Sequence, residues 1–297
     1  MILLARVRRL ALAPILALVA VLAAGASPVL AEPALWVIKD KDSTIYLFGT
    51  IHVLKPTTQW RSPKITKAFD AADDLVTEIV EPDDKTVTQA LMLKYGIDRE
   101  TPLSAKLKPE AYAKLETAAQ AMGFPPHGMD SMRPWMAAIT VSLVPLFKAG
   151  YDPESGVEKK LTAQAKAASK PIDAFETLEQ QLRFFADMTP DQEGQLLSST
   201  LDEVDEGPAK VDALVTAWAA GDQVALKAQM IDEMQRDYPE VYKLLLTDRN
   251  RDWAGQIKTK LAGSGVSFVA VGAGHLVGPD SVQAQLKALG IKAERVE

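Results

Sequence analysis

Both ends of the chain carry short apolar runs separated by polar turns, a pattern typical of a β-sheet. Residues 35–38 and 45–48 are apolar and flank a polar turn at 39–43, which predicts a β-hairpin. An amphipathic segment over about 62–72 predicts a helix, and the segment at 74–80 predicts another strand. Because a helix connects this strand to the one before it, we expect the two strands to run parallel.

The middle of the chain has a different pattern. From about residue 85 to residue 253, apolar residues recur every three or four positions among many Ala, Leu, Lys, Glu and Gln residues, which predicts helices. One strand is predicted within this region at 171–175, and the acidic segment 202–208, which contains Gly and Pro, predicts a flexible loop. We therefore expect a large α-helical insertion over about residues 85–255.

The C-terminal part returns to strand patterns. The apolar run 266–271 predicts a buried strand, 281–289 predicts a helix that ends at Gly290, and 291–296 predicts a last short strand. The sequence thus predicts an α/β fold, with a mixed β-sheet formed from both chain ends and the helical insertion between them. Residues 32–297 are expected to form a single domain.

Two of the three histidines occupy the same Gly-x-x-His (GxxH) pattern. Gly49-Thr50-Ile51-His52 follows the second strand of the hairpin, and Gly272-Ala273-Gly274-His275 follows the run at 266–271. Each histidine therefore falls where a predicted strand ends, which is where α/β folds place ligands and catalytic groups. The glycines allow the backbone to turn sharply or to approach a ligand closely.

Glu78, near the end of the strand at 74–80, is a third candidate residue. If the strand ends meet, His52, Glu78 and His275 supply two imidazoles and one carboxylate, a common open metal site. An ion bound there could activate water, with a nearby carboxylate as the base. The residues alone also allow a second interpretation, in which Glu78 is a solvated carboxylate and the two patterns coincide by chance.

Two further polar features lie outside this set. His127 is in a loop that contains Pro and Gly and is predicted to be a surface residue. The charged segment 248–253 fits an exposed helix face with ion pairs between residues three apart. Alternatively, its Arg249 and Asn250 face a substrate carboxylate, phosphate or carbonyl group.

The first 31 residues are predicted to be a secretory signal peptide. Arg6, Arg8 and Arg9 precede an uncharged stretch rich in Leu, Ala and Val, and cleavage is expected after Ala31. The alternative is an uncleaved membrane anchor, because the stretch is long enough to span a bilayer. We expect a periplasmic or secreted protein without stable membrane insertion after cleavage.

The composition narrows the choice of partners and cofactors. Without the predicted signal peptide the chain has 30 Lys and Arg residues against 39 Asp and Glu residues, a net charge of −9. An acidic chain without a basic run is not expected to bind nucleic acid or an anionic membrane surface. The sequence has no cysteine, so any metal must be held by His, carboxylate, Asn or water.

An ordered set of short motifs resembles the TraB/PrgY/GumN family over roughly residues 35–296. Each motif alone is weak evidence, but the set in this order is specific. Its members are Phe48-Gly49-Thr50-Ile51-His52, Leu75-Val76-Thr77-Glu78, Gly156-Val157-Glu158, Lys170-Pro171-Ile172, Phe175-Glu176-Thr177 with Gln181, Arg249-Asn250 with Trp253, and Val271-Gly272-Ala273-Gly274-His275-Leu276-Val277-Gly278. In two departures, Phe175 stands where the family more usually has Leu, and Glu158 where it commonly has Asp.

The resemblance implies a fold related to erythromycin esterase and the haem-binding ChaN lipoproteins. The family includes the Tiki proteins, which are described as divalent-metal-dependent proteases with two GxxH motifs and a Glu. By this resemblance His52 and His275 would bind Mn, Co or Zn, and Glu78 would be a ligand or the base. Arg249 and Asn250 would polarise the scissile carbonyl or hold a substrate terminus.

The expectation is therefore an exported metal-dependent hydrolase, similar to a protease or amidohydrolase, that acts on a peptide or a small molecule. Two alternatives stay open. One is a non-catalytic carrier of haem or another small ligand, with a His as axial ligand. The other is an accessory protein in export or polysaccharide-related processes that acts through protein contacts.

Overall fold

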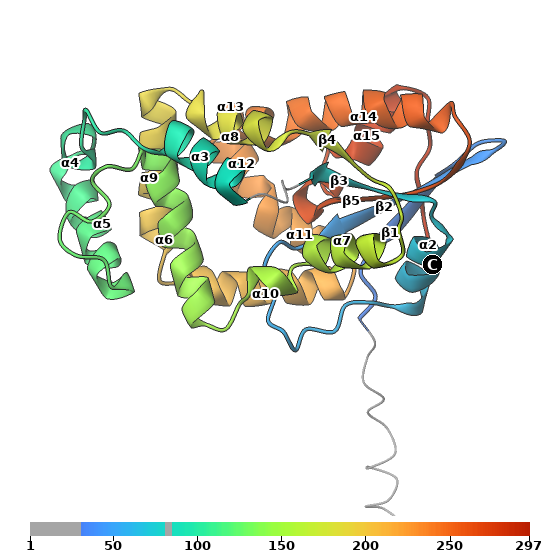
Figure 1. Ribbon diagram of the computed structural model, residues 1–297, viewed down its shortest axis with the longest axis horizontal. Helices are drawn as coiled ribbons and strands as arrows, with labels where there is room; N and C mark the ends of the chain where they lie inside the picture. Colours follow the sequence, from blue (N-terminus) through green and yellow to red (C-terminus); the bar gives the residue numbers. More distant parts are fainter. Residues whose placement is uncertain (1–30, 81–84) are drawn as a thin grey trace, which may run out of the picture.

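A six-stranded mixed β-sheet forms the centre of the molecule in the computed structural model, which describes residues 31–80 and 85–297 (Figure 1). All but the last residue of the predicted signal peptide lies outside these ranges. The strand order is β4-β3-β5-β2-β1-β6. The strands are β1 Leu35–Lys39, β2 Ser43–Thr50, β3 Asp74–Ile79, β4 Ile172–Glu176, β5 Gly265–Gly272 and β6 Glu294–Arg295.

The two ends of the chain meet in this sheet, as predicted. The hairpin of β1 and β2 is confirmed, and β5 pairs in parallel with both β2 and β3. Strands β2 and β3 therefore run parallel as expected, but they are not neighbours, because β5 lies between them. Strand β4 adds to β3 in parallel, and β6 pairs antiparallel with β1. The last strand is shorter than predicted.

Helices make up most of the remaining described chain. The α-helices are α2 Pro63–Ala71, α3 Lys85–Gly96, α4 Leu103–Lys106, α5 Pro109–Met122, α6 Pro134–Lys148, α7 Val157–Ala167, α8 Leu178–Ala186, α9 Pro190–Glu203, α10 Gly207–Ala219, α11 Gln223–Met230, α12 Asp232–Asp237, α13 Pro239–Tyr242, α14 Asp248–Leu261 and α15 Val282–Ala288. Short 3-10 helices occur at Pro153–Ser155 and Ala273–Leu276, and a π-helical turn occurs at Lys243–Thr247.

Alternating strand residues bury both faces of the sheet. Phe48 and Phe268 lie in one core with residues of α2, α7 and α10, whereas Leu47 and Val269 lie in another with residues of α14 and α15. Neighbouring residues of one strand point to opposite faces, so a strand covered on both sides is apolar at nearly every position. This explains why β2 and β5 appear in the sequence as continuous apolar runs.

From residue 85 to the start of β5 the elements are helices apart from β4, as predicted. Helices α5, α6 and α9 form a separate hydrophobic core at the end of the molecule away from the sheet (Figure 1). The loop predicted at 202–208 is mostly helical instead, since α9 continues to Glu203 and α10 begins at Gly207. Pro208 stands in the first turn of α10, where its missing N–H breaks no helical hydrogen bond. Within the described ranges, no helix is both long and apolar enough to cross a membrane.

Candidate functional site

The carboxyl ends of four neighbouring parallel strands define one edge of the sheet. Thr50 at the end of β2 is paired in register with Gly272 at the end of β5, and Ile79 of β3 with Glu176 of β4. Residues next to these positions in the sequence therefore lie close together at this edge of the sheet. For this reason the fold brings together motifs that are more than 200 residues apart in the sequence.

The two GxxH motifs contact each other directly. A Cβ atom at Gly49 would lie 3.1 Å from the Cα atom of Ala273, so the first motif packs against the backbone of the second. A Cβ atom at Gly272 would lie 3.0 Å from Oε1 of Glu78, 3.3 Å from Nε2 of His52 and 3.7 Å from Cδ2 of His275. The three predicted metal-site residues thus surround one point above Gly272, which only a residue without a side chain leaves open.

Glu78 is a buried carboxylate with several donors. The backbone N–H of Gly272 donates to Oε1 at 2.7 Å, and Oε2 accepts from Nη2 of Arg249 at 2.7 Å and from Nε2 of Gln181 at 3.0 Å. Burial acts to raise the pKa of Glu78, but attraction to the positive charges of Arg249 and His52, with the Gly272 hydrogen bond, outweighs it and holds the pKa below its usual value. Glu78 is therefore ionised at neutral pH.

His275 is buried and held in one tautomer. Its Nδ1 lies 2.6 Å from Oδ1 of Asn250, and its Nε2 lies 3.2 Å from Nη1 of Arg249. A guanidinium group can only donate, so Nε2 accepts from Arg249. Nδ1 therefore carries the ring proton and donates it in a hydrogen bond to the amide oxygen of Asn250. Burial lowers the pKa of His275 to about 3 despite the opposing attraction of Glu78, and the ring is neutral at neutral pH. Its Nε2 lies 3.7 Å from Oε1 of Glu78.

His52 is oriented by a different carboxylate. Its Nδ1 lies 2.7 Å from Oε1 of Glu158, which also accepts from the hydroxyl of Thr50. The Glu158 carboxylate raises the pKa of His52, although the side chain is 67% exposed and water screens part of this attraction. Helix α7 begins close to the histidine, since a Cβ atom at Gly156 would collide with the His52 carbonyl oxygen.

Arg249 joins the two buried carboxylates of the site. Nε and Nη2 bind the two oxygens of Glu176 at 2.8 Å each, Nη2 also reaches Glu78, and Nη1 reaches His275 and the carbonyl oxygen of Leu245. These contacts match the five N–H donors of a guanidinium group. Nε1 of Trp253 donates to Glu176 at 2.9 Å, which completes the network.

The segment 248–253 has one exposed face and one buried face. Asp248 and Arg251 form an exposed ion pair at 3.2 Å, whereas Arg249 and Asn250 point inward to the site. His127 is exposed, its Nδ1 lies 2.8 Å from the hydroxyl of Tyr112, and it contacts none of the site residues named above. It is a surface residue, as predicted.

Sequence reasoning assigned no individual role to four residues that complete the site. Glu158 orients His52, Glu176 and Trp253 hold Arg249, and Gln181 holds Glu78. One signal was available for Glu176, which directly follows the strand predicted at 171–175. A second signal was available for Trp253. It is four residues after Arg249, and that spacing places both side chains on one helix face.

No metal cluster is evident in the arrangement of these side chains. Among residues 31–80 and 85–297, no group of three or more His, Cys, Asp or Glu residues is spaced so that it could hold an ion as it stands.

The chain belongs to the TraB/PrgY/gumN family, whose sequence model matches residues 34–295. It is similar to a protein of Treponema pallidum (strain Nichols) named "Uncharacterized protein", with 23% identity over 265 residues. These residues cover 84% of this chain and 79% of that protein. No solved structure matches the chain significantly.

Proposed function

We propose that the protein is an exported metal-dependent hydrolase that cleaves an amide bond in a peptide or a small molecule. The observation that carries this proposal is the convergence of His52, Glu78 and His275 on the space above Gly272. The Nδ1 atoms of both histidines are engaged by Glu158 and Asn250, so Nε2 is the nitrogen of each ring that would bind an ion. On binding, His275 would give up its hydrogen bond from Nη1 of Arg249, and His52, whose pKa is raised, would release a proton.

The donor set fits a divalent ion such as Mn, Co or Zn in its chemistry. Histidines that bind metals almost always engage the second ring nitrogen with a carboxylate, a carbonyl oxygen or water, as His52 does with Glu158 and His275 with the amide oxygen of Asn250. Two donors that each lie about 2.1 Å from an ion are at most about 4.2 Å apart. The 3.7 Å between His275 Nε2 and Glu78 Oε1 satisfies this limit, and binding would require the set to close further around the ion.

The low pKa of Glu78 supports a role as ligand rather than base. An efficient general base has a pKa near the working pH, and a carboxylate whose pKa is held below its usual value holds a proton too weakly. In this proposal His52, Glu78 and His275 hold the ion. A bound ion would act as a Lewis acid that polarises the scissile carbonyl group.

Hydrolysis adds the oxygen of water to the carbonyl carbon and breaks the C–N bond, giving a carboxylate and an amine. The exposed face of His52 is where the substrate would approach, because Glu78 and His275 are buried. All donors of Arg249 and the amide of Asn250 are used within the protein. We therefore propose that these two residues position Glu78 and His275 rather than contact the scissile carbonyl group.

The test uses the exported chain loaded with Mn, Co or Zn and a broad library of quenched fluorescent peptides. We expect metal-dependent cleavage that His52→Ala abolishes. The proposal fails if the loaded protein cleaves no peptide and His52→Ala changes neither metal binding nor activity. A Soret band in the absorption spectrum of the purified protein would instead support a haem carrier.

A further inference from the structure

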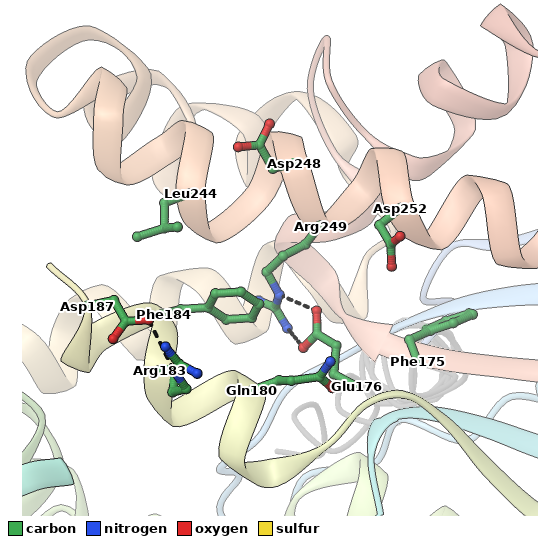
Figure 2. Close-up of a pocket in the computed structure, with 10 residues that line it drawn as sticks. All are labelled: Phe175, Glu176, Gln180, Arg183, Phe184, Asp187, Leu244, Asp248, Arg249 and Asp252. Carbon is green, nitrogen blue, oxygen red and sulfur yellow. Dashed lines mark hydrogen bonds and ion pairs between the residues drawn. The ribbon is translucent and has the colours of Figure 1, made fainter.

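A cavity of about 490 Å³ lies between α8 and α14 and is lined by Arg249 but not by His275. Figure 2 shows Arg249 and Glu176 meeting at its centre, with the residues of the two helices around them. Its volume is in the range of pockets that bind small molecules or side chains. None of His52, Glu78 or His275 lines it, so it is distinct from the proposed metal site.

The lining of the cavity favours a cation. Four carboxylates face it against two guanidinium groups, and the walls include two phenylalanine rings. The polar and aromatic lining residues are Glu176, Asp187, Asp248, Asp252, Arg183, Arg249, Phe175 and Phe184. Carboxylates together with aromatic faces bind guanidinium and ammonium groups, through charge and through the ring quadrupole.

The carboxylates differ in how they are neutralised. Glu176 is paired with Arg249 and Asp187 with Arg183, while Asp248 is bound to Arg251 outside the cavity. Asp252 accepts a hydrogen bond from the neutral amide of Gln256 at 2.8 Å, and the described residues provide no ion pair for it. Asp252 is thus the carboxylate that can take a cation from a ligand.

The protein already binds one guanidinium group here by the same chemistry. Arg249 is held by both oxygens of Glu176, and its Cζ atom lies 5.2 Å from the ring centroid of Phe184 and 4.7 Å from that of Trp253. A second cation that enters the cavity could bind in the same way, with Asp252 as the carboxylate and Phe175 or Phe184 as the aromatic ring.

The cavity is one layer of side chains away from the proposed metal site. Arg249 lines the cavity and also contacts Glu78 and His275. Phe175 stacks on Trp253 with ring centroids 5.2 Å apart, and Trp253 contacts the ring of His275 at 4.3 Å. A side chain bound in the cavity would therefore lie one layer of side chains away from the proposed metal site.

We propose that this cavity binds the guanidinium or ammonium group of a basic side chain, so that the substrate is a peptide with Arg or Lys near the cleaved bond. This inference rests on the proposed hydrolase function for its biological meaning, but the binding itself does not require catalysis. Asp252 and the two phenylalanine rings would be the specificity-determining residues.

The test measures binding by calorimetry in the absence of added metal, with Nα-acetyl-arginine amide and its neutral counterpart Nα-acetyl-citrulline amide as probes. We expect the arginine probe to bind about fivefold or more tightly than the citrulline probe, the size of effect that one partly exposed ion pair gives. Asp252→Asn should remove this preference, and Asp252→Lys should abolish binding of the arginine probe. Glu110→Gln, an exposed acid in the first turn of α5, is the matched control and should change nothing.

Equal binding of the two probes, or an unchanged preference in Asp252→Asn, would contradict the proposal. The outcome is separable from that of the hydrolase proposal. Cleavage of peptides without any preference for Arg or Lys would leave the hydrolase intact and refute the cationic pocket. Selective binding of the arginine probe without any cleavage would support the pocket and count against the hydrolase.

Discussion

The Nδ1 atom of His275 lies 2.6 Å from Oδ1 of Asn250, whose amide nitrogen in turn donates to the carbonyl oxygen of Asp280 at 2.8 Å. The carbonyl oxygen of Asp280 thereby orients the amide, and the amide oxygen keeps the ring proton on Nδ1. Nε2 is then the acceptor that contacts Arg249 and lies 3.7 Å from Glu78. The Arg-Asn motif on α14 and the second GxxH motif, which follows β5, therefore belong to one hydrogen-bond network. In this network the helix residues set the tautomer of His275.

Asn250→Ala should weaken metal binding without unfolding the protein. The substitution removes the acceptor of the Nδ1 proton, and loss of such a partner typically costs about 10–100-fold in metal affinity. It also leaves a buried N–H unpaired, which we expect to cost about 1–3 kcal/mol in the free energy of unfolding. Metal titration and urea denaturation measure the two effects. Asn250→Asp keeps an acceptor oxygen and should retain most of the affinity; if it binds metal no better than Asn250→Ala, the oxygen is not the relevant group.

Glu158→Gln should also reduce metal affinity, through His52. The carboxylate orients the ring from Nδ1 and raises its basicity, which a neutral amide does less well. We expect a loss of about tenfold or more in a direct metal titration. Glu154→Gln, four residues earlier and exposed, is the matched control and should bind metal as the wild type does. Equal affinities for both variants would show that Glu158 has no positioning role.

Arg249→Leu should destabilise the fold strongly. The guanidinium is 9% exposed and is the charge partner of the buried carboxylates Glu78 and Glu176. Removing one partner of a buried ion pair leaves an uncompensated charge and costs about 3–5 kcal/mol. Arg251→Leu, two positions along the same helix and exposed, should change the unfolding free energy by no more than about 0.5 kcal/mol. Chemical denaturation of both variants gives the comparison, and similar losses would refute the network.

His275 should make the protein sensitive to acid between pH 6.5 and about 3. Burial lowers its pKa to about 3 in the folded state, whereas in the unfolded chain it takes up a proton near pH 6.5. In this window the unfolded state binds more protons, so stability falls as the pH falls. His275→Gln removes the titrating group, and its denaturation midpoint should decline less steeply than that of the wild type across this window. Parallel pH profiles would mean that His275 is not held neutral by the fold.

The individual strands of the sheet were predictable from local patterns, but their neighbours were not. Apolar runs at β2 and β5 are visible in the sequence because each strand is buried on both faces. The insertion of β5 between β2 and β3 depends on packing between distant segments, which no local pattern records. The meeting of His52 and His275 follows from that insertion, so the sequence could suggest it only through the ordered motifs.

The partners of the site residues were harder to predict than the residues themselves. Glu158 and Glu176 are two acids among 39 in the chain, and what distinguishes them is the position of α7 and β4 in space. Helical spacing was more informative for Arg249, because Trp253 and Ile257 follow it at intervals of four and are buried. The helical spacing of Arg249 was hard to recognise because Asp248 and Arg251, its charged neighbours, form an exposed ion pair on the other face of the helix.

The central claim is that both GxxH motifs and Glu78 build one metal site, and metal content tests it most directly. The wild type, His52→Ala and His275→Ala are each loaded with Mn, Co or Zn, desalted and analysed for metal per chain, with the exposed His127→Ala as the matched control. The claim predicts one equivalent of metal in the wild type and in His127→Ala, and a large loss in both of the other variants. Full metal content in His52→Ala and in His275→Ala would contradict it.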